Sequence, residues 1–258
     1  MTGPANPRLC ALRARIQALE SGPGPRRVTP FGLPAVDAAL PGGGLALGAL
    51  HEIMGAGADE EDGAVAAGFA AALLARLTRL HGGVVLWCLQ SDDLYAPGLA
   101  AYGLAPTQLL VARCRDDSES LWAMEEGLRS AVPTAVLGEI GSLAPTAGRR
   151  LQLACEASGV TAFVLRRWRE AGMAARQRAA PSAAVTRWRV AAAPSRDIAE
   201  PGVGTPLWLV ELVRCRGGAP GAWVIAEGLK EEVDATDHVA LAAGLADRPA
   251  PTRLARAG

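Results

Sequence analysis

Short apolar strands alternate with helices along most of this chain, and this alternation limits the folds that it can adopt. Predominantly apolar runs at residues 84–89, 133–143 and 160–168 are typical of strands that are buried on both faces of a sheet. Helical patterns separate or precede these runs, at residues 63–80, 118–131 and 149–158. The order predicts right-handed βαβ units, a mostly parallel sheet and an α/β fold.

The pattern changes after Trp168. Residues 206–216 and 222–227 alternate apolar and polar side chains on either side of the glycine-rich turn GGAPG, following a similar run at 184–192. This predicts a C-terminal β-hairpin that extends the sheet in the antiparallel sense. We therefore expect one core over residues 28–227 and a flexible tail over residues 228–258, which is acidic and then basic with two prolines near its end.

Residues 1–27 predict a short helix followed by a linker. Four apolar side chains share one helical stripe, with arginines opposite, and SGPGPRR ends the helix. The stripe is a candidate protein interface, and the alternative is a helix packed on its own domain. Its residues are Leu9, Leu12, Ile16 and Leu19.

Composition limits the classes of partner and of binding site that this protein is expected to have. Basic and acidic residues balance at 26 each, so net charge favours neither a nucleic-acid nor a membrane partner. Five scattered cysteines without a CxxC motif argue against a disulfide framework or a zinc site, and we expect no metal and reduced thiols. With no apolar N-terminal segment and no uninterrupted run of 18 apolar residues, a cytoplasmic protein without a membrane partner is predicted.

The stretch EIMGAGADEEDGA, residues 52–64, has the layout of a phosphate-binding loop between a strand and a helix. In the pattern GxxxxGK[ST], backbone N–H groups and a lysine neutralise phosphate charge, and a hydroxyl holds Mg²⁺. Counting from Gly55, the second glycine, the lysine and the hydroxyl fall on Glu60, Glu61 and Asp62. At an effective dielectric constant of about 20, two unit charges about 4 Å apart interact by about 4 kcal/mol. We therefore expect no bound nucleotide cofactor. The acids form either a solvated turn or a docking corner for a basic partner.

The segment GLPAVDAALPGGGLALGALHEIMG, residues 32–55, resembles the entry to a RecA-type core. Together with the altered loop, it makes residues 7–227 similar to the ImuA family, the RecA/SulA-like accessory proteins of bacterial damage-induced mutagenesis. The resemblance implies a RecA-like P-loop-type core with a degenerate nucleotide site and no catalytic residues. It also implies a non-enzymatic adaptor in SOS translesion synthesis, associated with the nucleoid on damage. The implied partners are an ImuB-like Y-family polymerase homologue and an error-prone DNA polymerase III alpha-type subunit. RecA is a further candidate.

The resemblance also indicates where an ATPase would keep its acidic residues. A catalytic glutamate is expected just after the second core strand, where LQSDDL places Ser91, with Asp92 or Asp93 one or two residues on. A Mg²⁺-associated aspartate is expected at the end of the next buried strand, where the chain has Gly138 and Glu139. Asp92 as base and Glu139 as metal ligand would make a RecA/KaiC-like ATPase, which remains one alternative. A SulA-like cell-division inhibitor is the other.

A basic stretch follows the last apolar strand. Residues 149–196 hold ten arginines against two acids, most densely in RRWREAGMAARQR. The resemblance places a DNA-contacting loop here, and arginines beside a tryptophan suit phosphate contact and base stacking. Single-stranded DNA, RecA or ImuB could bind this surface, and a solvated basic loop is the alternative. The candidate residues are Arg166, Arg167, Trp168, Arg169, Arg176 and Arg178. Arg187 and Arg189 are instead expected on the outer face of a strand.

Overall fold

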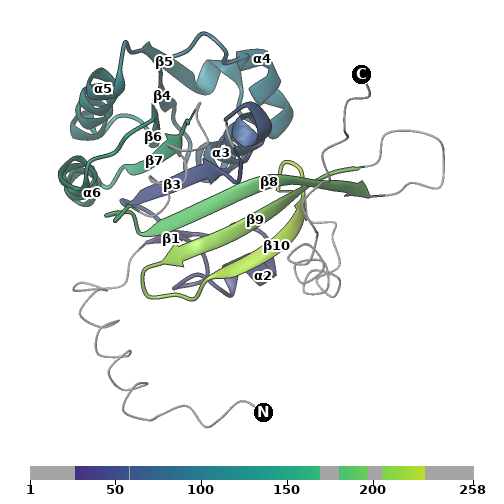
Figure 1. Cartoon of the computed structure of the whole chain (residues 1–258). Helices are drawn as coiled ribbons and strands as arrows, with labels where there is room; N and C mark the ends of the chain where they lie inside the picture. The colour runs from purple at the N-terminus through teal and green to yellow at the C-terminus, as the bar shows by residue number, and fades with distance from the viewer. Residues whose placement is uncertain (1–26, 58, 169–179, 197–204, 230–258) are drawn as a thin grey trace, which may run out of the picture.

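The computed structural model describes residues 27–57, 59–168, 180–196 and 205–229. Their centre is an eight-stranded sheet in the order β10-β9-β8-β3-β7-β6-β4-β5 (Figure 1). The strands of this sheet are β3 (Leu50–Gly55), β4 (Val85–Leu89), β5 (Leu109–Arg113), β6 (Ala135–Ile140), β7 (Thr161–Arg166), β8 (Thr186–Arg196), β9 (Thr205–Cys215) and β10 (Gly221–Ala226). The α-helices are α2 (Pro34–Asp37), α3 (Asp59–His81), α4 (Ala96–Leu99), α5 (Asp117–Ser130) and α6 (Pro145–Ser158).

Six neighbouring strands, from β8 through β3, β7, β6 and β4 to β5, run parallel. Strands β9 and β10 continue the sheet in the antiparallel sense. The predicted α/β class, the mostly parallel sheet and the C-terminal hairpin are therefore confirmed. Strand β5, which forms one edge of the sheet, was not predicted.

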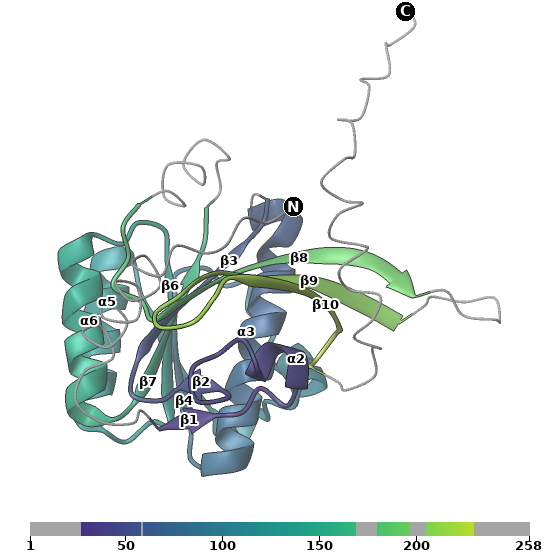
Figure 2. The same cartoon turned by 90° about the horizontal axis from the view of Figure 1, so that it is seen from below.

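Helices cover both faces of the sheet, which explains why the central strands are apolar on both sides. Helix α3 packs on one face, and α5 and α6 pack on the other (Figure 2). The α3 side holds an aromatic cluster in which Phe31 and Phe69 lie 5.1 and 5.9 Å from the ring of Trp188, respectively. The α5 and α6 side is aliphatic and includes Met124 and Leu151.

Helix α3 begins at Asp59, four residues before its predicted start. The three acids after Asp59 therefore lie in the first helical turn and not in a solvated loop, which corrects that expectation. Negative charge at this end of a helix is favourable because the backbone dipole places partial positive charge there. By length and composition alone, the part Glu61–His81 could cross a membrane, but 67% of its most apolar window is buried inside the fold.

The segment before β3 forms a compact turn that leads into the sheet. It contains a small two-stranded sheet of β1 (Val28–Thr29) and β2 (Leu45–Ala46). The Asp37 carboxylate accepts hydrogen bonds from the backbone N–H groups of Phe31 and Gly32, at 2.6 and 3.0 Å. The predicted N-terminal helix with its apolar stripe, and residues 230–258 of the predicted tail, lie outside the described residues.

Candidate functional site

The carboxyl ends of β3, β4, β6 and β7 meet at one edge of the sheet, as the ends of parallel strands do. A pocket of about 800 Å³ opens there, beside the beginnings of α3 and α5. Its polar side chains come from segments far apart in the sequence. They include Asp59, Gln90, Asp93, Asp117, Glu139 and Arg167.

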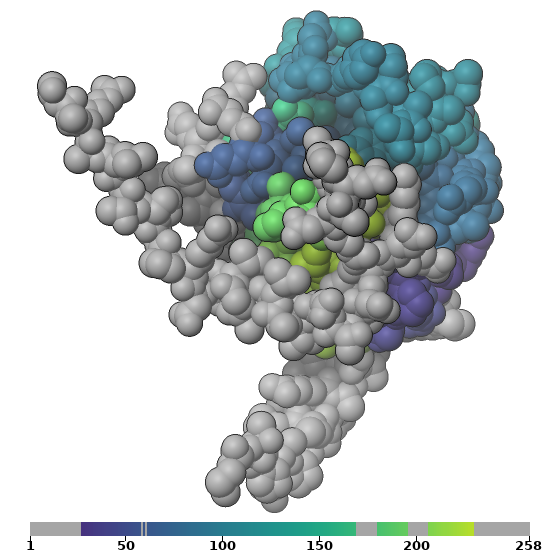
Figure 3. Space-filling view, turned by 90° about the vertical axis from the view of Figure 1, so that its right-hand side faces the viewer, coloured from purple at the N-terminus to yellow at the C-terminus, as the bar shows by residue number. Residues whose placement is uncertain are grey.

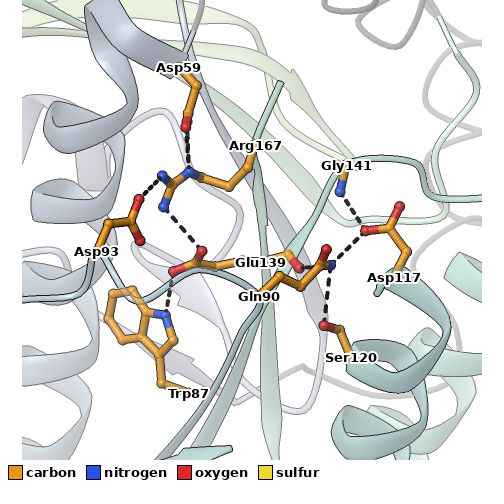
Figure 4. Close-up of polar contacts among 9 residues, drawn as sticks. All are labelled: Asp59, Trp87, Gln90, Asp93, Asp117, Ser120, Glu139, Gly141 and Arg167. Atoms are coloured by element: carbon orange, nitrogen blue, oxygen red, sulfur yellow. Dashed lines mark hydrogen bonds and ion pairs between the residues drawn. The ribbon is translucent and has the colours of Figure 1, made fainter. Parts of the chain in front are cut away.

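The guanidinium of Arg167 lies at the centre of this edge (Figure 4). Its Nε is 2.7 Å from Oδ1 of Asp59, which is the first residue of α3. Its Nη2 is 2.6 Å from Oδ2 of Asp93, beyond the end of β4, and its Nη1 is 3.1 Å from Oε2 of Glu139 in β6. One cation that follows β7 thus joins three carboxylates from three other elements.

Both carboxylate oxygens of Glu139 are engaged. Oε1 accepts a hydrogen bond from the indole Nε1 of Trp87 at 2.9 Å, and Oε2 faces Arg167. Burial raises the pKa of Glu139, while the charge of Arg167 and the Trp87 hydrogen bond act in the opposite direction. Burial lowers the pKa of the Arg167 guanidinium, but its bonds to Asp59 and Asp93 and the charge of Glu139 outweigh burial and raise it. Arg167 therefore remains a cation.

A second network fixes the neighbouring loops. Asp117, in the first turn of α5, accepts hydrogen bonds from the backbone N–H groups of Gly141 and Ser142, at 2.9 and 2.7 Å. The side-chain amide of Gln90 donates to Asp117 at 2.8 Å and to the backbone oxygen of Glu139 at 3.0 Å. These bonds hold the end of β4 and the loop after β6 against α5 (Figure 4).

The glycine loop before α3 is filled by acids of the same chain. Oδ2 of Asp62 accepts a hydrogen bond from the backbone N–H of Gly57 at 2.6 Å. A Cβ atom added at Gly57 would collide with the carboxylate of Glu61, so that carboxylate lies against the loop backbone. Oδ1 of Asp62 also lies 3.4 Å from the N–H of Ala192 in β8, and α3 (blue) and β8 (green) are neighbours in Figure 3. The site is thus an acidic corner held together by one arginine.

A scan against models of known protein families finds no match for the chain. Among curated proteins, Protein ImuA of Caulobacter vibrioides strain NA1000 / CB15N is 43% identical over 204 residues, which cover 78% of this chain and 84% of the relative. Protein ImuA of strain ATCC 19089 / CIP 103742 / CB 15 matches with the same identity and coverage. The chain belongs to the ImuA family. The family resemblance drawn from the sequence is confirmed.

In this ImuA-family protein, the two acids considered for an ATPase, Asp92 and Glu139, pair with different arginines. Asp92 is exposed and forms an ion pair with Arg113 of edge strand β5, and it is not among the residues that line the pocket with Glu139. Asp93 faces the pocket instead, but it is bonded to Arg167. Within the described ranges, no group of three or more His, Cys, Asp or Glu side chains has a geometry that could hold a metal ion.

The DNA-contacting role predicted for Arg166 and Trp168 is corrected by their burial. They are 5% and 2% exposed. Arg166 is the last residue of β7, which lies between two other strands; its guanidinium carbon is 5.2 Å from the ring centroid of Trp168. The Trp168 indole donates to the backbone oxygen of Gly141 at 2.8 Å. Neither ring nor guanidinium is open to a nucleic acid in this arrangement, because both are covered by the fold.

The other arginines of the predicted basic stretch differ in their surroundings. The guanidinium of Arg167 is bonded to the three carboxylates, while Arg169, Arg176 and Arg178 lie outside the described residues. Arg189 lies on the partly exposed face of β8 as predicted, paired with Glu211 at 2.5 Å. Arg187, expected on the same outer face, is instead buried beside Glu52 of β3, with 2.6 Å between Nε and Oε2.

The Arg167 cluster was missed by sequence reasoning. Its partners are 28, 74 and 108 residues away from it along the chain, so no local spacing reveals them. One signal was available: Asp93, Glu139 and Arg167 each follow or end a predicted strand, and such positions in a parallel sheet meet at one edge.

Proposed function

We propose that this protein is a non-catalytic accessory protein in damage-induced mutagenesis, acting in the ImuA/ImuB system of translesion DNA synthesis. Membership of the ImuA family supports the process. The acidic corner supports the absence of ATP-driven chemistry, and it is the observation that carries this part of the proposal.

The core is best interpreted as a RecA-like P-loop-type core whose nucleotide site has been converted. Strand β3 lies inside the parallel sheet and leads through a glycine loop into the long helix α3. In nucleotide-binding proteins of this layout, the helix N-terminus and loop N–H groups receive phosphate. Here Asp62 accepts the N–H of Gly57, and the Glu61 carboxylate lies beside it. The carboxylates take the place of a bound anion.

Charge explains why a nucleotide would not bind. A triphosphate at the start of α3 would lie close to Glu61 and Asp62, with no lysine in the loop to offset them. Each close like-charge pair costs about 4 kcal/mol at an effective dielectric constant of about 20. Since about 1.4 kcal/mol is a factor of ten in affinity, even a small part of this repulsion removes useful binding.

The direct test is nucleotide binding and turnover by the purified protein, with and without single-stranded DNA. We expect neither ATP binding nor hydrolysis in the presence of Mg²⁺. DNA-stimulated hydrolysis would instead support the RecA/KaiC-like alternative. In cells, deletion of the gene should lower the frequency of mutations after DNA damage, and complementation should restore it. Filamentation on overexpression without any effect on mutation would favour a division inhibitor.

We further propose that the partners are an ImuB-like polymerase homologue and an error-prone polymerase III alpha-type subunit, with RecA and single-stranded DNA as additional candidates. Two surfaces are proposed for them: the N-terminal stripe around Leu12 and Ile16, and the arginines Arg169, Arg176 and Arg178. Removing residues 1–21 should abolish at least one association in pull-down experiments. If every association survives this deletion, the stripe is not the interface.

The acidic first turn of α3 is a candidate docking corner for a basic partner. Reversing the charge of Glu60, Glu61 and Asp62 together should weaken the pull-down of such a partner. Charge reversal of Glu126 on the exposed side of α5 serves as the control, because that residue pairs only with its own helix neighbour Arg129 among the described ion pairs. Equal loss with both variants would point to general electrostatics and not to a specific corner.

A further inference from the structure

The Arg167 guanidinium is bound like a ligand. Each of its three nitrogen atoms faces a different carboxylate: Nε faces Asp59, Nη1 faces Glu139 and Nη2 faces Asp93. A guanidinium presents its donors in a planar fork, so one group can satisfy acceptors in three directions, which a lysine ammonium at the end of a flexible chain does less well. The three carboxylates surround a site that is complementary in shape and charge to a guanidinium ion.

A backbone hydrogen bond also connects the start of α3 to the residues after β7. The N–H of Asp59 donates to the backbone oxygen of Trp168 at 3.0 Å. The first residue of α3 is therefore attached to the chain beyond β7 twice, once through its backbone and once through its carboxylate. If the guanidinium were absent, Asp59, Asp93 and Glu139 would leave three like charges near one another with no cation between them, and Glu139 is buried.

We propose that Arg167 is a positioning residue, an internal cation that holds the first turn of α3 against the ends of β4, β6 and β7 without any bound ligand. It deepens the proposed function, on which it rests for its biological meaning: the edge of the sheet that would receive a nucleotide is here held in place by a side chain. Arg167 and Trp168, which follow β7, are then held in one position relative to α3.

The proposal predicts chemical complementation. Truncation in Arg167→Ala leaves a guanidinium-shaped gap among the three carboxylates, and free guanidinium ion, well below denaturing concentrations, should refill it. Urea has nearly the same planar shape but no charge, so it should not. Sodium chloride at matched ionic strength separates specific binding from screening.

The measurement is amide hydrogen exchange of the isolated full-length protein, followed at Asp59 and at Trp168. In Arg167→Ala, protection of the Asp59 amide should fall by about tenfold or more, equivalent to about 1.4 kcal/mol. Guanidinium should restore most of that protection, while urea and salt should not. The control is Arg189→Ala, which removes a two-bond pair with Glu211 elsewhere on the sheet and should leave the Asp59 amide unchanged.

Unchanged exchange at Asp59 in Arg167→Ala overturns the proposal, and so does equal recovery with guanidinium and urea. If the alanine variant does not fold, Arg167→Lys is measured instead. It keeps the charge but cannot reach three acceptors, so it should show a smaller loss that guanidinium no longer repairs. Lysine behaviour identical to the native protein would also overturn the proposal. Because exchange is measured without partners, such a failure would not test the role in mutagenesis. That role is tested separately by the mutation frequency of the gene deletion.

Discussion

Glu139 is a buried carboxylate whose surroundings shift its pKa in opposite directions. Burial raises its pKa, and Arg167 and Trp87 partly offset that rise. When a folded-state pKa of an acid lies above its unfolded value, the folded state binds the proton more tightly. Stability is then gained as the pH falls through the folded pKa, down to the unfolded one. Arg167 limits this effect by supplying a positive partner at neutral pH.

Removing Arg167 should therefore make stability depend more strongly on pH. In Arg167→Ala, the pKa of Glu139 should rise further, because burial remains and the cation is gone. The loss of stability relative to the native protein should be larger at about pH 8 than at about pH 5, because the fraction of Glu139 that carries a proton, and so needs no cation, grows as the pH falls. Urea unfolding at both pH values measures the difference.

The double variant Arg167→Ala with Glu139→Gln provides the matched comparison. A neutral glutamine can still accept a hydrogen bond from Trp87, but it cannot titrate. The two pH values should then give nearly the same loss. If the single variant shows no larger loss at the higher pH, the buried charge of Glu139 is not what Arg167 compensates.

Glu52 lies between two buried arginines in the sheet. It should contribute more to stability than Glu211, which pairs with a partly exposed arginine. Its Oε2 is 2.6 Å from Nε of Arg187, and its Oε1 is 3.9 Å from Nη1 of Arg166, with all three side chains at most 10% exposed. Glu52→Ala leaves two buried cations without their carboxylate and should cost about 3–5 kcal/mol in the free energy of unfolding. Glu211→Ala, at the partly exposed pair with Arg189, should cost about 1 kcal/mol or less. Similar losses in urea titrations would contradict this assignment.

At the scale of elements, the beginning of α5 serves two purposes. Asp116 is the N-cap, and its side chain accepts the N–H of Glu119 at 2.9 Å. Asp117 turns toward the loop after β6 and binds Gly141 and Ser142. The first acid stabilises the helix end, while the second attaches that end to the edge of the sheet.

These two roles predict different effects of substitution. Asp116→Ala should cost about 1 kcal/mol, the usual loss for a helix cap. Asp117→Ala removes several bonds to a charged acceptor and should cost about 2 kcal/mol or more. It should also raise the hydrogen exchange of the Gly141 and Ser142 amides, which the Asp116 variant should not affect. Equal exchange in the two variants would show that Asp117 does not fix this loop.

The elements that the sequence predicted well are those with strong periodicity. Strand β4 and helix α5 were placed within one residue at each end because their apolar patterns are unambiguous. The start of α3 was placed too late, since a run of acids resembles a loop, although acids are also favoured in a first helical turn. Strand β5 was missed because it is a short edge strand, half exposed, and its sequence shows no clear alternation.

At the scale of the whole molecule, the sequence predicted an altered phosphate loop but not the arginine cluster beside it. Arg167 lies at the centre of that cluster, whereas the arginine-rich pattern and the family resemblance assigned it to a DNA-contacting stretch. Its true environment is set by three carboxylates that only the folded sheet brings together. Arg166 and Trp168 were misassigned for the same reason, because adjacency to arginines in sequence does not reveal burial.

The proposed loss of the nucleotide site involves the whole edge of the sheet, and repairing the loop alone should not restore nucleotide binding. The variant Glu60→Gly, Glu61→Lys, Asp62→Ser recreates the GxxxxGK[ST] pattern from Gly55. We expect it to bind no ATP in a fluorescent-nucleotide titration with Mg²⁺. Asp59 and Asp93 would still crowd the phosphates with negative charge, and Glu139 would remain bonded to Arg167 and unavailable to a metal ion. A circular-dichroism melt is the control for folding. Saturable binding by the folded loop variant would show that the loop alone excludes nucleotide, and that the arginine cluster is compatible with a bound triphosphate.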